Sequence, residues 1–160
     1  MEIRNKNGQV IHRSADSHDF MALDLREAVL ESMLLQGAHF ENSNLESANF
    51  RGADLYWGNF FQSNLTGADL ERAQLQGADL KEANLTNANL REANLGRDNL
   101  GGSSQLQGAR LEGANLESAF LEGVEYDVDT VFPKAFDPQK NKMILKLSRQ
   151  PDKSFHEKAG

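Results

Sequence analysis

The sequence predicts an all-β fold, a solenoid in which short extended segments alternate with tight turns. Three observations support this class. Leu or Phe recurs at every fifth position from Phe20 to Leu100, and the series resumes after one inserted residue at Leu106 and continues to Tyr126. A small residue, most often Ala, stands two positions before most of these residues. The remaining positions are mostly polar or charged, and such internal repetition outweighs any local propensity.

A period of five residues fits neither an α-helix nor a flat strand. In a helix, five residues advance by roughly 500°, which scatters the leucines around the axis. In an extended segment, positions two apart point the same way, so the small residue and the following Leu or Phe both face inward. The other two residues then turn a corner. Several second corner residues, such as Gly52 and Gly77, are glycines, which suits the positive φ of a type II turn.

The most regular stretch, Ala83 to Leu95, repeats the unit Ala-Asn-Leu-x-x. This pattern resembles the pentapeptide repeat family, whose units read A(D/N)LXX, and the resemblance covers about two thirds of the chain. It implies a right-handed quadrilateral parallel β-helix with four units per coil. The chain would then form about five coils with N- and C-terminal caps. The implied period of twenty residues predicts that Phe20, Phe40 and Phe60 stack in one internal column.

The same period places corner residues of alternating charge above one another, and we expect them to form a ladder of ion pairs between coils. They are Glu31, Arg51, Glu71, Arg91 and Glu112.

Three segments make up the expected organisation. Residues 1–19 form an N-terminal cap, in which Asn7-Gly8 between apolar residues predicts a hairpin over the open end of the solenoid. Residues 20–126 form the β-helix, and residues 127–160 form a C-terminal cap with a polar tail. Residues 25–35 also have the composition of a short capping helix, but the unbroken spacing of their leucines favours the coil.

One stretch departs from the repeat. Asp98 occupies an inward small position, where a carboxylate without partners would be costly. The extra residue of the series lies just beyond it, among glycines and serines. We therefore predict a one-residue bulge within residues 96–105, which lets Asp98 reach backbone donors or solvent in a structural rather than a catalytic role.

A cluster of aromatic residues interrupts the polar exterior at corner positions, where side chains point outward. Exposed aromatic residues on an uncharged β-face are typical of a protein-binding patch. An alternative is that Trp57 folds over the glycines one coil away or packs under a terminal segment. The candidate binding residues are Tyr56, Trp57 and Phe61, with Gln36 and Gln76 one coil to either side of Tyr56.

No catalytic constellation, phosphate-binding loop or metal-ligand spacing is found, and the chain has no cysteine. We therefore expect no enzyme activity, no cofactor and no metal. Residues 20–126 carry 16 acidic and 7 basic side chains, a net charge of −9, which disfavours direct nucleic-acid binding. The charged start and the absence of a long apolar run lead us to expect no membrane association and a cytoplasmic location.

Two functional hypotheses follow. The first is a rigid, non-enzymatic scaffold, a monomer or end-to-end dimer, that presents a flat β-face to a protein partner of unknown identity. The second is implied by the resemblance. Some members of that family mimic the shape and charge of duplex DNA and inhibit DNA gyrase, and by binding this topoisomerase they protect it from quinolones. The distribution of charges favours the first, since no continuous acidic stripe runs along any of the four expected faces.

Overall fold

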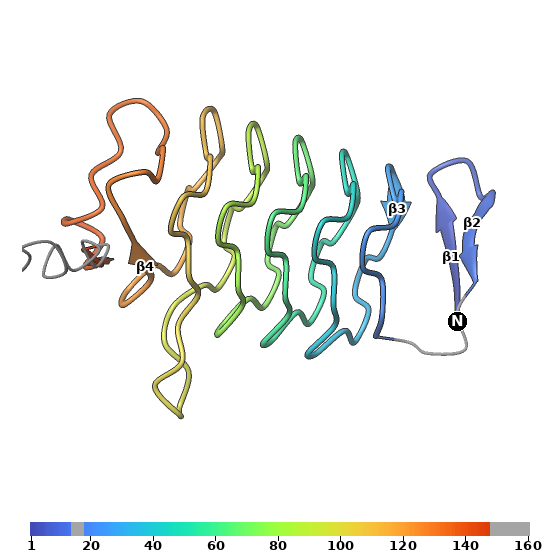
Figure 1. Ribbon diagram of the computed structural model, residues 1–160, viewed down its shortest axis with the longest axis horizontal. Helices are drawn as coiled ribbons and strands as arrows, with labels where there is room; N and C mark the ends of the chain where they lie inside the picture. The colour runs from blue at the N-terminus through green and yellow to red at the C-terminus, as the bar shows by residue number, and fades with distance from the viewer. Residues whose placement is uncertain (14–17, 148–160) are drawn as a thin grey trace, which may run out of the picture.

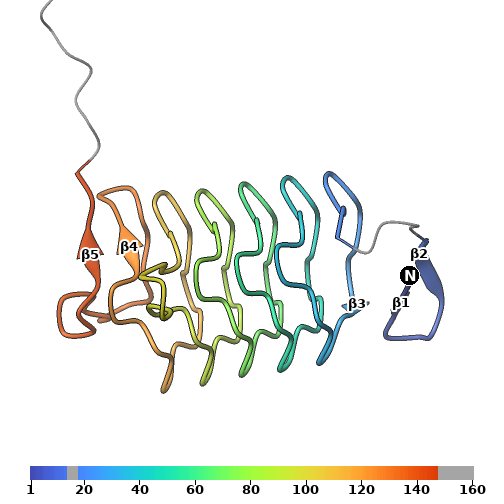
Figure 2. The same cartoon turned by 90° about the horizontal axis from the view of Figure 1, so that it is seen from below.

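A computed structural model describes residues 1–13 and 18–147. The chain forms a rod of stacked coils, seen from two sides in Figures 1 and 2. The strands are short, since most rungs of the coil are single bridge pairs. None of the described residues belongs to a helix capable of crossing a membrane. The strands are β1 (Glu2–Asn5), β2 (Val10–Arg13), β3 (Ala28–Val29), β4 (Glu125–Tyr126) and β5 (Ile144–Leu145).

The coil repeats every twenty residues over most of its length. Parallel bridges join His39 to Asn59 and Asn59 to Asp79, and the same spacing recurs on the other sides. Each turn of the rod therefore contains four five-residue units, and the inward Leu or Phe residues of these units fill the core. This is the four-sided parallel arrangement predicted from the sequence.

The five-residue unit satisfies all of its backbone amides, as the unit from residue 48 to residue 52 illustrates. The amides of Asn49, Phe50 and Gly52 donate to carbonyls of the neighbouring coils at 2.7–2.8 Å, and the amide of the small residue closes the turn at 3.0 Å. The fifth amide, that of Arg51, donates to the side-chain Oδ1 of Asn49 at 3.0 Å. Asn or Asp is therefore favoured at this outward position because its side chain caps an amide that the coil leaves unpaired.

The predicted aromatic column is confirmed. Phe20 and Phe40 stack with ring centroids 4.8 Å apart, and Phe40 and Phe60 stack at 5.0 Å. Phe50 meets the last two rings edge-on, at 5.6 and 6.0 Å. All four side chains are fully buried, so the aromatic rings lie within the N-terminal part of the core.

Additional strands cover the N-terminal end of the rod. β1 and β2 form an antiparallel hairpin, and β1 also pairs with β3 of the first coil. Ile3 of β1 is buried. The hairpin protects an otherwise open sheet edge at this end of the rod. The helix considered for residues 25–35 is absent, because Leu25 and Leu30 both point into the core of a regular coil.

At the C-terminal end, β5 pairs in parallel with β4 and continues the ladder of the coil. Phe132 packs edge-on against Tyr126 at 5.4 Å and stacks on Phe136 at 5.1 Å. These rings lie beyond the last coil and cover its apolar cross-section. The polar tail, residues 148–160, lies outside the described residues.

The prediction of a one-residue bulge is wrong. Asp79 bridges Gln105, 26 residues away, so this coil has six more residues than the others. Leu100, expected inside, is 83% exposed. The physical reason is that the inward position is taken by Ser104, whose hydroxyl donates to a core carbonyl at 2.6 Å, whereas the Asp98 carboxylate stays outside. Residues 96–103 leave the rod as a loop, drawn in yellow in Figure 1.

The insertion also changes the predicted charge ladder. Arg51 pairs with Glu71 at 2.8 Å, and Arg91 lies 3.5 Å from Glu71, as expected. In the next coil Arg91 faces Glu117 at 3.7 Å, and it also pairs with the adjacent Glu92 at 2.8 Å.

Glu112 was predicted at the position of Glu117 but lies on another corner. The six extra residues of the longer coil move every later five-residue unit on by one corner. Glu31, the predicted first member of the ladder, instead accepts a hydrogen bond from the side-chain amide of Asn49 at 3.1 Å.

Candidate protein-binding surface

Tyr56 and Trp57 form the corner that follows the inward Leu55. Trp57 has a φ of 56°, which directs its side chain along the rod toward the next coil. There the indole lies over Gly77, where a Cβ atom would be only 2.8 Å from Trp57 Cε2. The alternative interpretation, that Trp57 folds over a glycine, is therefore correct for Gly77. The side chain nevertheless remains 50% exposed.

The loop of residues 96–103 begins at the same corner two coils further along, and Asp98 organises it. One carboxylate oxygen, Oδ1, accepts hydrogen bonds from the amides of Leu100 at 2.8 Å and Gly102 at 2.7 Å. The amide of Asp98 in turn donates to the carbonyl of Gly102 at 2.8 Å. These three bonds close the loop on itself, so its shape does not depend on the coil alone.

The aromatic corner supports this loop. The Tyr56 hydroxyl donates a hydrogen bond to the second carboxylate oxygen of Asp98. The edge of Trp57 lies against Gly102, where a Cβ atom would be 2.8 Å from Trp57 Cζ2. We refer to Tyr56, Trp57 and loop residues 98–102 together as the corner–loop surface.

The contact between the corner and the loop shifts the pKa of both Tyr56 and Asp98. The hydrogen bond from Tyr56, assisted by the Gly102 and Leu100 amides, holds the pKa of Asp98 below its ordinary value. The same bond raises the pKa of Tyr56, because losing the phenolic proton would leave two anions in contact. Near neutral pH the pair is therefore an anionic carboxylate bound by a neutral phenol.

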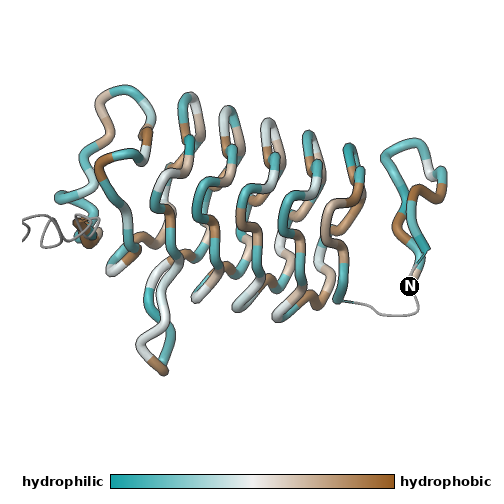
Figure 3. Tube along the Cα trace, in the orientation of Figure 1, coloured by the Kyte–Doolittle hydropathy of each residue, from teal (hydrophilic) through white to brown (hydrophobic). Residues whose placement is uncertain are grey.

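The tip of the loop is hydrophobic, and the tube of Figure 3 is brown there. The base of the loop is fixed, because the Ser103 hydroxyl donates to the Gly123 carbonyl at 2.7 Å, and Ser104 is bonded in the core. Leu100 therefore projects into solvent from an anchored loop. Leu100 is a single exposed apolar residue, and we include it in the candidate surface because its loop packs against Trp57 at Gly102.

The structure brings only some of the predicted binding residues together. The rings of Tyr56 and Trp57 are 6.1 Å apart, and Gln36 and Gln76 lie on the same corner, one coil to either side. Phe61 begins the next corner, beyond the strand that carries Asn59, and is half-buried. It is therefore not part of the corner–loop surface.

Sequence reasoning did not include Asp98 and Leu100 in the candidate site. A signal was present, since a carboxylate at an inward position marks a point where the coil cannot continue.

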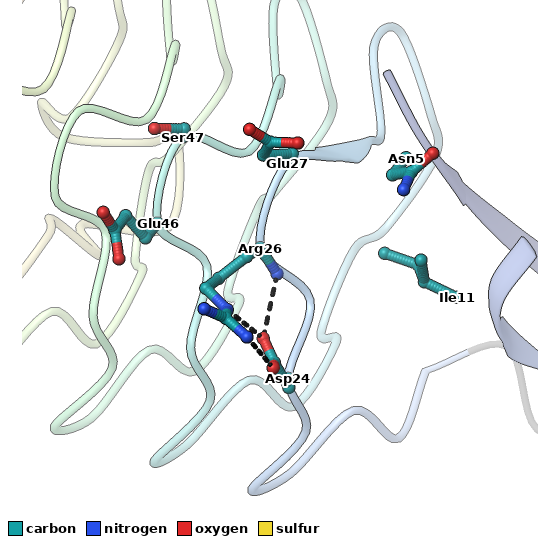
Figure 4. Close-up of a pocket in the computed structure, with 7 residues that line it drawn as sticks. All are labelled: Asn5, Ile11, Asp24, Arg26, Glu27, Glu46 and Ser47. Atoms are coloured by element: carbon teal, nitrogen blue, oxygen red, sulfur yellow. Dashed lines mark hydrogen bonds and ion pairs between the residues drawn. The ribbon is translucent and has the colours of Figure 1, made fainter. Parts of the chain in front are cut away.

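A separate hollow lies between the N-terminal hairpin and the first coils (Figure 4). Arg26 extends into it but is bound there by both oxygens of Asp24, at 2.8 and 2.7 Å. Within residues 1–13 and 18–147, no group of three or more acidic or histidine side chains could hold a metal ion. This hollow offers no obvious reacting group, and the corner–loop surface remains the better candidate.

The comparison with protein families identifies the chain. Its sequence matches the model of pentapeptide repeats over residues 24–62, 59–97 and 104–125, well over half of its length. The chain therefore belongs to the pentapeptide repeat family, and its fold is the right-handed quadrilateral β-helix predicted above. The matched ranges omit residues 98–103, which form most of the loop.

Solved structures of this family are similar to the chain. The pentapeptide repeat protein Rfr23 from the cyanobacterium Cyanothece 51142 is 41% identical, with a TM-score of 0.56, and the match covers 61% of this chain and 63% of that one. The chain thus aligns with less than two thirds of that relative. A pentapeptide repeat protein from the Arabidopsis thaliana thylakoid lumen is 32% identical, with coverages of 76% and 74% and a TM-score of 0.48.

QnrB1, a plasmid-mediated fluoroquinolone resistance protein, is 15% identical, with coverages of 82% and 75% and a TM-score of 0.48. This likeness concerns the fold alone. None of the curated proteins compared with the chain matches it. The expected cytoplasmic location stays a prediction, since one of these relatives comes from a thylakoid lumen.

Proposed function

We propose that this protein is a non-catalytic scaffold that binds a protein partner through its corner–loop surface. The observation that carries the proposal is a half-exposed Trp57 that packs against Gly102 of a loop whose apolar tip, Leu100, is itself exposed. Trp and Tyr are among the residue types that most often supply the binding energy at protein interfaces.

The internal bonds of the loop support the proposal further. Asp98 accepts hydrogen bonds from two loop amides and from Tyr56, so these bonds hold the loop before any partner arrives. A surface that is already ordered loses little conformational entropy on binding. The loop also adds residues that the core does not need, which is typical of segments that carry function.

The second hypothesis, a DNA-mimicking modulator of DNA gyrase, has the acidic body of the rod in its favour. The ion pairs weigh against it, because Glu71 is flanked by Arg51 and Arg91. A corner on which charges of opposite sign alternate does not reproduce the continuous negative charge of a DNA backbone. We therefore retain it only as the alternative.

The proposal can be tested by capturing partners from host lysate on tagged protein. We expect a partner that binds the wild type and is lost from the Tyr56→Ala/Trp57→Ala double variant. Leu34→Ala is the control, because Leu34 is a 74% exposed apolar residue that lies three coils before the base of the loop. Circular dichroism establishes that all three proteins are folded.

Two results would count against the proposal. A partner retained by the double variant would place the binding site elsewhere on the rod. Recovery of a type II topoisomerase, equally by the wild type and the double variant, would favour the alternative, and a supercoiling assay with that enzyme would then decide it.

A further inference from the structure

A second hollow, of about 500 Å³, lies on the other flank of the loop, between its base and the C-terminal cap. We call it the C-terminal hollow. Phe120 lines it and is 65% exposed. It is an aromatic residue at an outward position where other coils carry polar residues such as Asn94. Such an exposed ring inside a concave site is available for an apolar group of a ligand.

Three cationic side chains surround this ring. Arg97 comes from the base of the loop, where its side chain lies over Gly123, and Lys140 and Lys142 come from the segment before β5. The only acidic residue that lines the described hollow is Glu122. The site therefore has a net positive charge on a rod whose residues 20–126 carry a net charge of −9.

These cations are available to a ligand. Lys142 Nζ lies 3.2 Å from Glu122, but both side chains are about 70% exposed, at 72% and 69%. Lys140 Nζ lies 3.8 Å from Asp137 and is 84% exposed. Exposed pairs of this kind contribute little stability, so either lysine can exchange its partner for a ligand carboxylate at little cost.

We propose that the C-terminal hollow binds an acidic peptide segment of another protein, one that carries an apolar side chain among its carboxylates. The carboxylates would pair with Arg97, Lys140 and Lys142, and the apolar side chain would pack on Phe120. The cations come from two separate segments, the base of the loop and the segment before β5, an arrangement that suits an extended chain better than one compact anion. The acidic remainder of the rod repels a long polyanion such as nucleic acid.

The experiment uses a fluorescein-labelled Asp-Glu-Phe-Asp-Glu peptide and fluorescence anisotropy with the full chain. We expect saturable binding that weakens as the salt concentration rises, because the contacting charges are exposed. Arg97→Gln/Lys142→Gln should weaken binding by about tenfold, since each exposed pair contributes up to about 1 kcal/mol. Phe120→Ala should weaken it several-fold.

Matched controls separate these effects from general changes in charge or stability. Arg26→Gln/Arg110→Gln alters the net charge equally but lies away from the hollow, and Leu34→Ala removes an apolar side chain from the same outward column as Phe120. Both should bind the peptide as the wild type does. Tyr56→Ala/Trp57→Ala should also bind it, so this proposal can fail or succeed separately from the proposed function.

The proposal would be overturned by absence of binding, or by equal binding of the uncharged peptide Asn-Gln-Phe-Asn-Gln. It would also be overturned if inorganic phosphate displaced the peptide at concentrations similar to that of the peptide itself. In that case the hollow would be a site for small anions.

Discussion

At the scale of single residues, the backbone of Gly77 determines how the aromatic corner can form. The Trp57 indole crosses this coil so closely that any Cβ at Gly77 would clash with it. Gly37 occupies the same corner position one coil before Trp57, with a similar positive φ of 66°, and a Cβ there would meet no described atom within 4 Å. Substitutions at these two glycines therefore allow the effect of backbone strain to be distinguished from the effect of the contact with Trp57.

We predict that Gly37→Ala and Gly77→Ala each lose about 1–2 kcal/mol of folding free energy from the left-handed backbone alone. Gly77→Ala should lose more, and it alone should shift the fluorescence maximum of Trp57, the single tryptophan of the chain. Thermal denaturation and emission spectra provide the measurements. An identical spectrum in the two variants would show that Trp57 does not lie over Gly77.

The Tyr56–Asp98 bond predicts a pH window for the contact between corner and loop. The lowered pKa of Asp98 gives stability that is present above its ordinary pKa and is lost as pH falls through the lowered value. The raised pKa of Tyr56 gives stability that is present below its ordinary pKa and is lost as pH rises through the raised value. Trp57 fluorescence should therefore change at both acidic and alkaline pH.

Tyr56→Phe is the control for this window. It removes the hydroxyl and keeps the ring, so both transitions of Trp57 fluorescence should weaken or disappear. A pH profile identical to that of the wild type would mean that the hydrogen bond does not hold the loop.

At the scale of elements, the loop of residues 96–103 shows what periodicity can and cannot predict. The spacing of leucines predicted the coil because one inward apolar residue per unit is what its core requires. The length of the loop was missed because its six extra residues equal one unit plus one residue, so Leu100 continues the count of fives although it is exposed. Only the carboxylate of Asp98 indicated that this unit could not point inward.

The candidate site was predictable to a similar extent. Trp57 and Tyr56 were predicted as outward aromatic residues because their corner positions follow from the repeat. Their contacts with Asp98 and Gly102 were not, because these depend on where an irregular loop lies relative to the coil, and no local pattern specifies that. The placement of Phe61 on a different corner does follow from the repeat, since it stands five residues after Tyr56.

The loop should be dispensable for folding. Deletion of residues 98–103 joins Arg97 to Ser104 and restores a coil of regular length, with Ser104 at its inward position. We expect this variant to fold with a circular dichroism spectrum and melting temperature close to those of the wild type. An unfolded variant would show that the loop is a structural part of the rod.

At the scale of the whole molecule, the rod has one continuous hydrophobic core. A charged side chain placed in this core could reach neither water nor a partner of opposite charge. Leu85 is fully buried at the centre of the rod, whereas the next residue, Thr86, begins a corner. Leu85→Lys should cost more than about 4 kcal/mol and unfold the body, because the ammonium group would have neither water nor a partner. Thr86→Lys adds the same charge at the surface and should remain folded, as circular dichroism can show. A folded Leu85→Lys variant would contradict the inward assignment.

In the proposed function, a protein partner binds the rod at the corner–loop surface. A photocrosslinking amino acid at position 100, on the exposed loop tip, is compared with one at position 34, a 74% exposed apolar position three coils before the loop. We expect a specific crosslink to the captured partner from position 100, and none from position 34. Crosslinking from position 34 alone, equally from both, or from neither would contradict it.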